Sequence, residues 1–385
     1  MRLRVLFAIH GPASDRTAVY RTVSSKVDYL REQGHRVDLV TADDLRWVSP
    51  RLDPVCLPPV LACKGVSRYD VAVFHSYLGY AFHALHPVLD PGRRTATITS
   101  FHGLEPLYFR ALAHEGLRQG RPLSRRYRLL HGTVMPRLLR ASCRASDAVF
   151  CLNSSEAQYL AAQGWAAADR VHVLPNGIEA EGFIERQPRT AIRELLFIGQ
   201  WLAAKGTRYL VQAFADLAAR EDVHLTCLGT GASEEVVAAA FPESARARVR
   251  VVPSAARAQV YDALRTADLF LFPTLSEGFS KALLEAMAAG LPVVTTPVGA
   301  ASDLMRDGHN GLVVPPADAS AAASAVTRYL RDPELAARHG AAARATAEAY
   351  RLGPVCRQWA DRLYSVVDRH ARDARGLERR HDAVL

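Results

Sequence analysis

Two glutamates, Glu277 and Glu285, stand on either side of an expected turn from a strand into a helix. The apolar run 269–272 has the length of a buried strand. Ser280 can cap a helix that Gly290 then ends, because serine and glycine suit these two helix termini. The pattern therefore places Glu277 in the loop before the helix and Glu285 inside it.

This pair of carboxylates suits the recognition of a hydroxylated phosphate ester. In an open α/β sheet, ligands bind beyond the carboxyl ends of the strands, where the amino end of a helix attracts phosphate. Carboxylates beside such a site accept hydrogen bonds from hydroxyl groups. A nucleotide sugar meets both conditions. Taken alone, the two residues also fit a solvated loop position and a solvated helix position.

The whole string from residue 273 to 315 decides between these interpretations. It contains P-T-L-S-E-G-F-S, then L-E-A-M-A-A-G-L-P-V-V, then D-G-H-N-G-L-V-V-P. It resembles the E-x7-E region of the retaining glycosyltransferases of family 4, which have the GT-B fold. The resemblance implies that Glu277 contacts the donor-sugar hydroxyls as a catalytic residue, and that Glu285 holds the ribose. It implies these donor-binding residues in the region: Gly278, Phe279, Ser280, Leu284 and Glu285.

A second loop, at residues 197–206, carries a lysine suited to phosphate. Lys205 follows an expected strand-to-helix turn at Gly199 and Gln200, and a lysine there supplies a point charge for phosphate oxygens. The family has an arginine and a lysine in this loop that bind the donor diphosphate. The resemblance makes Lys205 a catalytic and donor-binding residue, with Gly199 and Gln200 beside it. Gln200 stands where arginine is usual, so the loop has one positive charge fewer unless another basic residue compensates.

His102 is the third candidate catalytic residue. It follows an expected strand in the string S-F-H-G-L-E, residues 100–105. This string resembles the H-G or H-D motif of the family, whose histidine reaches toward the donor sugar. A histidine at a strand end also fits a structural role, and its place after the fourth strand favours the functional one.

Three further glycines are candidates for the donor site. Gly229 and Gly231 follow an expected strand and match the family's G-x-G loop, which lines the nucleotide pocket, although glycine there also fits a simple turn. Gly11 lies in the first loop, where the family often has a Gly-Gly pair close to the donor phosphates, and where this chain has one glycine. Asp15 in the same loop suits a helix cap and receives no definite role.

Short apolar runs alternate with helical patterns along the whole chain, which indicates parallel sheets built from β-α units. The expected strands are Leu3–Ile9, Arg36–Thr41, Asp70–Phe74, Thr95–Ser100, Ala148–Leu152, Val171–Leu174, Leu195–Ile198, His224–Leu228, Val249–Val252, Leu269–Phe272, Pro292–Thr295 and Gly311–Val314. A chain of 385 residues also suits two domains rather than one. We therefore expect an α/β protein with two doubly wound, Rossmann-like domains.

The resemblance assigns these domains to a GT-B fold, with parallel sheets that face each other across a cleft. The acceptor-binding domain is expected over residues 1–180 and the domain that binds the nucleotide-sugar donor over residues 193–350. Residues 351–385 are expected to form a C-terminal helix that packs back on the first domain, with residues 373–385 frayed.

Composition and cysteine spacing bear on the cellular compartment of the protein and on whether it binds a metal or a cofactor. The six cysteines form no C-x-x-C or zinc-type pattern, so we expect reduced thiols, a cytoplasmic protein and no metal site. No apolar run approaches the ~18 residues of a membrane span. The apolar run 5–9 is shorter than that of a signal peptide and is expected to lie in the first strand. No cofactor is expected, since the nucleotide sugar is a substrate.

Positive charge is concentrated in the first half of the chain. Residues 1–180 contain 23 Lys and Arg against 15 Asp and Glu, and the remainder contains 25 against 24. Residues 118–144 contain eight arginines and no acidic residue, and their leucines recur at near-helical spacing. This segment fits either an ordinary domain helix or a peripheral contact with an anionic membrane at its inner face. Its few aromatic residues argue against nucleic acid as a partner.

Together these features predict a retaining, metal-independent glycosyltransferase of hexosyltransferase type. It would transfer a sugar from a nucleotide sugar to a hydroxyl of a lipid-linked or polysaccharide-precursor acceptor, or of a small molecule. Two alternatives stay open: a non-catalytic or scaffolding relative, raised by Gln200 and the first loop, and a sugar phosphorylase on the same fold. A nicotinamide oxidoreductase is disfavoured because neither half contains G-x-G-x-x-G after an early strand.

Overall fold

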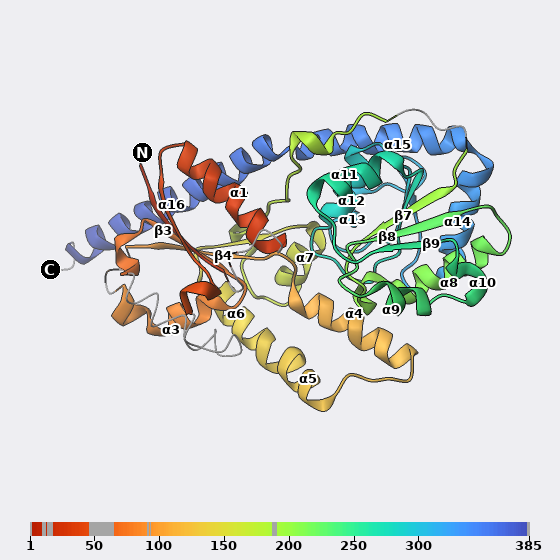
Figure 1. Cartoon of the computed structure of the whole chain (residues 1–385). Coiled ribbons are helices and arrows are strands. Elements are labelled where there is room, and N and C mark those ends of the chain that lie inside the picture. Colours follow the sequence, from red (N-terminus) through yellow and green to blue (C-terminus); the bar gives the residue numbers. More distant parts are fainter. Residues whose placement is uncertain are drawn as a thin grey trace.

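The structure is a computed structural model of the chain, which describes residues 2–9, 13, 18–45, 65–90, 92, 94–186 and 191–382. Gly11 and Asp15 lie outside the described residues. The described chain forms two six-stranded parallel sheets surrounded by helices (Figure 1). This arrangement confirms the expected α/β class with two doubly wound domains.

The first domain contains the sheet with strand order β2-β1-β3-β4-β5-β6. Its strands are β1 (Arg4–Ala8), β2 (Arg36–Val40), β3 (Val71–His75), β4 (Ala96–Ser100), β5 (Ala148–Cys151) and β6 (Val171–Val173). Its principal helices are α1 (Ala18–Glu32), α3 (Leu78–Leu89), α4 (Glu105–Arg118), α5 (Arg125–Leu129), the π-helical turn η4 (Leu130–Val134), α6 (Met135–Ala145) and α7 (Ser154–Ala162). The order reverses between β1 and β3, which are parallel neighbours, so the chain extends the sheet outward from this point first to one side and then to the other.

The second domain contains the sheet with strand order β12-β11-β10-β7-β8-β9. Its strands are β7 (Glu194–Ile198), β8 (His224–Leu228), β9 (Val249–Val252), β10 (Leu269–Phe272), β11 (Val293–Thr295) and β12 (Leu312–Val313). Its helices include η7 (Ala203–Lys205), α8 (Thr207–Ala218), α9 (Glu234–Ala239), α10 (Glu243–Arg246), α11 (Arg257–Thr266), α12 (Lys281–Ala288), α13 (Ala301–Leu304), α14 (Ala319–Arg331) and α15 (Pro333–Ala347). Here the order reverses between β7 and β10, which is where an open α/β sheet forms its ligand crevice.

All twelve expected strands are confirmed, and each end differs from the prediction by at most one residue. The agreement has a simple cause. Parallel strands covered on both faces read as continuous apolar runs, and β3, β4, β5 and β10 are buried along their whole length.

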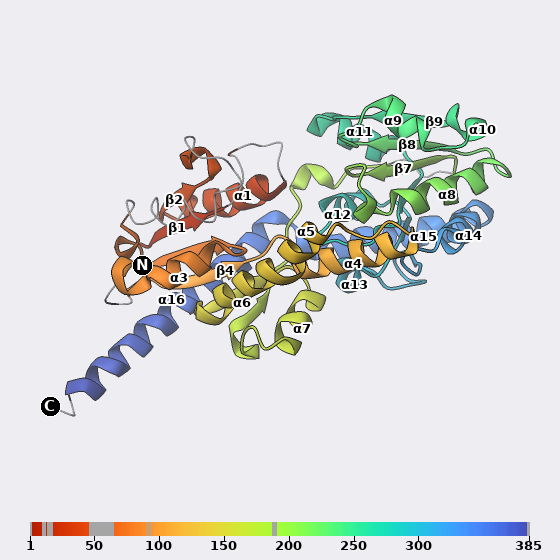
Figure 2. The same ribbon diagram turned by 90° about the horizontal axis from the view of Figure 1, so that it is seen from below.

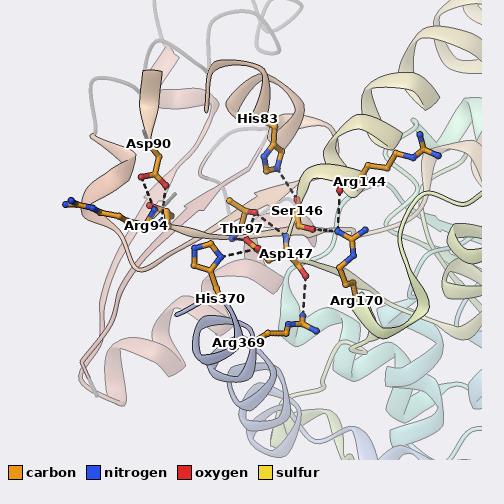
Figure 3. Close-up of polar contacts among 11 residues, drawn as sticks. His83, Asp90, Arg94, Thr97, Arg144, Ser146, Asp147, Arg170, Arg369 and His370 are labelled. Carbon is orange, nitrogen blue, oxygen red and sulfur yellow. Dashed lines mark hydrogen bonds and ion pairs between the residues drawn. The ribbon is translucent and has the colours of Figure 1, made fainter. Parts of the chain in front are cut away.

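The C-terminal helix α16 (Leu352–Asp382) returns to the first domain, as expected (Figure 1). Trp359 stacks on Phe7 of β1 with ring centroids 5.6 Å apart, and several apolar side chains of α16 complete the core of that domain. Farther along, His370 Nδ1 lies 3.1 Å from Asp147 Oδ1, and Arg369 donates to the Asp147 backbone oxygen at 3.2 Å (Figure 3). The helix α16 continues to Asp382, and the fraying expected over residues 373–385 stays a prediction.

Candidate active site

Lys205 and Glu277 meet at the reversal point of the second sheet. Lys205 ends η7, which follows β7, and Glu277 lies in the loop after β10; the Lys205 ammonium donates to Glu277 Oε1. The two loops are joined at one backbone carbonyl, since Ala204 O accepts hydrogen bonds from the Thr274 side-chain Oγ1 at 3.0 Å and from Leu275 N at 2.8 Å. Gly206 closes the turn with a φ of 68°, a left-handed conformation that favours glycine. The fold thus holds a cation and a carboxylate together at the crevice.

Glu285 lies on α12, and the start of this helix is the one that the sequence predicts. Ser280 Oγ accepts a hydrogen bond from Leu283 N at 3.2 Å and caps the helix. Glu285 is 5% exposed, and Arg257 Nη1 donates to its Oε1 at 2.6 Å. Burial raises the pKa of Glu285, and the charge of Arg257 acts in the opposite direction. The other arm of Arg257 donates to Glu179 Oε2 at 2.7 Å, so the helix is tied to the segment between the domains.

His102 lies on the first domain, in a loop that packs directly on the Glu277 loop of the second. A Cβ added to Gly278 would lie 2.5 Å from Gly103 Cα and 2.8 Å from His102 O. Asn153, which caps α7, donates from Nδ2 to Gly278 O at 2.9 Å across the same junction. The imidazole ring of His102 lies 4.7 Å from that of His75, centroid to centroid. The His102 backbone therefore lies against the loop that carries Glu277, and the His75 ring lies beside the ring of His102.

The remaining predicted donor-site residues occupy different environments. Gly229 and Gly231 have φ values of 70° and 65°, with open space where a Cβ would be. Gln200 is exposed, and Gly199 follows β7 with its N–H donating to Leu228 O at 3.0 Å. Phe279 is 9% exposed and Leu284 fully buried, both packed in the core of the second domain. The Leu284 side chain therefore faces that core, and the donor contact expected from it stays a prediction.

Three polar residues of this region carry no signal in the sequence. His75 comes at the end of β3, Arg257 begins α11, and Asn153 precedes α7. The contacts of these residues can be recognised only when the strand order and the domain contact are known, because their partners are 27 to 125 residues away in the chain. Among the described residues, no group of three or more His, Cys, Asp and Glu side chains is placed to hold a metal ion.

Comparison with known proteins identifies the two halves separately. Residues 19–181 match the family described as Glycosyltransferase Family 4, and residues 192–332 match the family described as Glycosyl transferases group 1. The chain belongs to glycosyltransferase family 4. This membership confirms the resemblance found in the sequence. The first matched range contains β2 to β6 of the first sheet, and the second contains all six strands of the second sheet.

Several curated proteins resemble this family 4 chain over about half its length. The D-inositol 3-phosphate glycosyltransferase of Xylanimonas cellulosilytica is 35% identical over 227 residues, 54% of this chain and 54% of that protein. The phosphatidyl-myo-inositol mannosyltransferase of Mycolicibacterium smegmatis is 34% identical over 187 residues, 46% of this chain and 47% of that protein. The chain thus spans about half the length of the curated relatives that it matches.

Solved structures extend the likeness to the whole fold. Sucrose-phosphate synthase from Thermosynechococcus elongatus superposes with a TM-score of 0.77 at 18% identity, covering 95% of this chain and 99% of that one. HepE of Anabaena in complex with UDP-glucose gives a TM-score of 0.67 at 18% identity, covering 94% and 100%. At these identities the likeness supports the fold alone, and that fold is GT-B, as expected.

Proposed function

We propose that this family 4 protein is a retaining glycosyltransferase that moves a hexose from a nucleotide sugar to an acceptor hydroxyl. One observation carries the proposal. The Lys205–Glu277 pair lies at the reversal point of the second sheet, and the His102 loop of the first domain packs against it. In this proposal the His102 imidazole would approach the ion pair from the other domain, at the place where such sheets bind nucleotides.

The roles follow from the chemistry of each group. Lys205 and the free N–H groups at the start of α12 would stabilise charge that develops on the departing diphosphate. Glu277 would accept hydrogen bonds from the sugar hydroxyls and orient the ring, and His102 would approach the sugar from the first domain. No enzyme nucleophile is assigned, because in this family retention is thought to proceed by attack of the acceptor from the leaving-group face.

The nucleoside would lie beside Glu285 and the two glycines of the 229–231 loop. Arg257 already occupies Glu285 Oε1, so a ribose hydroxyl would donate to Oε2. In this proposal Arg257 fixes the carboxylate in its ionised form, because a buried carboxylate otherwise favours the protonated form. HepE, which shares the fold, has been solved with UDP and with UDP-glucose, and we propose UDP as the first nucleotide to test.

Nucleotide binding is measurable by thermal unfolding in the presence of UDP, GDP, ADP or dTDP. A ligand at about a hundred times its dissociation constant stabilises the native state by about 2.7 kcal/mol, so one nucleotide should raise the unfolding midpoint. Lys205→Ala and Glu285→Ala should reduce that rise. The matched control is Arg220→Ala in the turn after α8, whose exposed side chain pairs only with Asp216 among the described residues. No rise with any nucleotide would contradict the proposal and favour a non-catalytic relative.

We also propose that the acceptor is presented at an anionic membrane surface, with the protein bound peripherally at the cytoplasmic face. The segment 118–144, here called the basic arm, lies below the two sheets together with α4 in Figure 1, and its helices α5 and α6 run across the front when the molecule is seen from below (Figure 2). Neither α5 nor η4 contains a buried residue, and Leu129 is 62% exposed and Leu130 43% exposed. Only α6 buries side chains, among them Leu139. The ordinary helix interpretation thus suits α6, whereas residues 118–134 expose apolar and cationic side chains together.

Flotation with liposomes tests this surface. We expect the protein to float with vesicles that contain anionic lipid and to be released by high salt, since surface charges are screened within about 8 Å at physiological ionic strength. Replacing Leu129 and Leu130 together by serine should abolish flotation without loss of folding, because both are exposed. Val236→Ser on α9, also an exposed apolar residue (58%), is the control. Flotation that is unaffected by salt and by the double variant would refute the proposed contact. No described helix is both long and apolar enough to cross a bilayer.

A further inference from the structure

Glu156 is a buried carboxylate in the first turn of α7, and the chemistry described above does not use it. It is 1% exposed. Leu104 N donates a hydrogen bond to its Oε1 at 3.0 Å, and Leu152 N donates to its Oε2 at 2.8 Å. Its own N–H donates at 2.9 Å to Oδ1 of Asn153, the residue that caps the helix. Each carboxylate oxygen therefore accepts a backbone N–H from a different loop.

These two loops follow neighbouring strands of the first sheet. Leu104 lies two residues after His102, in the loop between β4 and α4, and Leu152 directly follows β5. Because β4 and β5 are parallel and adjacent, both loops leave the same edge of the sheet. The Glu156 carboxylate thus joins the carboxyl ends of two strands and fixes the point at which the His102 loop turns into α4.

The same turn of α7 also contacts the second domain. Asn153 Nδ2 donates to Gly278 O at 2.9 Å, and Ser154 N donates to Asp303 Oδ2 at 2.7 Å. Asp303 belongs to α13, and both views of the molecule place α7 beside that helix (Figures 1 and 2). One turn of helix therefore connects the His102 loop of the first domain with the Glu277 loop of the second.

We propose that the ionised Glu156 is a positioning residue that holds the His102 loop against the Glu277 loop for sugar transfer. Only the ionised form offers an acceptor at both oxygens. Protonation would place a hydrogen on one oxygen, beside an N–H group that needs an acceptor, so one of the two loops would lose its anchor. A small displacement of a reacting group has a large effect on rate. The inference rests on the proposed function and adds the residue that places its first-domain loop.

The ionisation of Glu156 gives this role a pH dependence. Burial raises its pKa to about 7, while the hydrogen bonds from Leu152, Leu104 and Asn153 act in the opposite direction. The negative charge of Asp303 adds to the increase. As the pH rises through about 7, the carboxyl loses its proton and takes the form that anchors both loops. We therefore expect kcat/KM to rise between about pH 6 and about pH 8.

Other titratable groups lie near these loops. Cys151 and His172 stay neutral near pH 7, because burial raises the pKa of the thiol and lowers that of the imidazole to about 4. Burial also raises the pKa of Glu105, which directly follows Leu104, so a substitution is needed to assign the pH dependence to Glu156. The charged or titratable groups in or beside the contacts of α7 include Asp303 of α13, Cys151 of β5, His172 of β6, His102 of the loop before α4, and Glu105 and Arg110 of α4.

Glu156→Gln tests the need for charge, because glutamine is similar in size but has one acceptor oxygen. This variant should lower kcat/KM for sugar transfer at about pH 8 by about tenfold or more. It should also remove the rise that the unaltered protein shows as the pH passes about 7. A merely structural carboxylate would lower the unfolding midpoint and leave that rise in place. The matched control is Glu243→Gln, an exposed glutamate in the first turn of α10, which should change neither quantity.

NMR spectra of the unaltered full chain provide a measurement that needs neither a substrate nor a folded Gln variant. The amide signals of Leu104 and Leu152 should titrate together with one midpoint at about 7. Asp303→Asn should move that midpoint to lower pH, since it removes a negative charge but keeps an acceptor for Ser154 N.

The two measurements separate this inference from the proposed function. The inference is overturned if the two amide signals do not titrate together, or if Glu156→Gln transfers sugar at the normal rate with an unchanged pH dependence. Joint titration in a protein that transfers sugar from no nucleotide sugar would support Glu156 as the anchor of both loops, while contradicting the proposed transferase function.

Discussion

Replacing Lys205 by alanine should lower kcat by about a hundredfold, which is typical for the loss of one group that stabilises developing charge. Lys205 is held at the crevice by the turn that ends at Gly206, and its ammonium pairs with Glu277. In the free protein that pair keeps both side chains in place. When a nucleotide sugar binds, the ammonium would contact the diphosphate oxygens, and Glu277 would accept hydrogen bonds from the sugar hydroxyls. The cation then acts mainly as the glycosidic bond breaks, so kcat should fall more than KM rises.

Steady-state kinetics of sugar transfer check this expectation. Lys205→Arg keeps the positive charge but replaces the ammonium with a planar guanidinium. It should retain more activity than the alanine variant. Arg220→Ala should behave as the unaltered protein, because the Arg220 side chain is exposed in the turn after α8 and pairs with Asp216. Transfer by Lys205→Ala at near-normal kcat would remove Lys205 from the mechanism.

The sequence predicts the parts of this site that depend on local structure. The strand 269–272, the loop with Glu277 and the cap at Ser280 all follow from nearby residues, and the structure has each of them. Short-range patterns are reliable here because buried parallel strands and helix termini restrict which residues can occupy them. The positions of Lys205 and Glu277 at two strand ends could therefore be expected before their contact was known.

Long-range pairing could not be predicted in the same way. Arg257 pairs with Glu285 only because α11 follows β9 at one edge of the sheet while α12 follows β10 at its centre. His75 meets His102 because β3 and β4 are neighbours in register, with His75 opposite Ser100. Composition likewise does not reveal that α16 stays helical to Asp382, beyond its contact with Asp147.

Gly278→Ala should reduce kcat/KM by about a hundredfold or more, because a misplacement of about 1 Å near a reacting group can have an effect of that size. The new Cβ would lie 2.5 Å from Gly103 Cα, 2.8 Å from His102 O and 2.9 Å from Gly103 N. All three atoms belong to the backbone of the other domain, so no side-chain rotation relieves the contact.

The substitution should separate the domains at this junction while leaving each domain folded. The hydrogen bond from Asn153 to Gly278 O, 2.9 Å long, would be lost, and hydrogen exchange should increase around residues 102–104 and 277–279. Gly353→Ala is the control, because a Cβ there meets nothing within 4 Å, and it should leave both exchange and transfer unchanged. If Gly278→Ala retained full activity with unchanged exchange, the His102 loop would not need to touch the Glu277 loop, and the assignment of His102 to the site would lose its geometric basis.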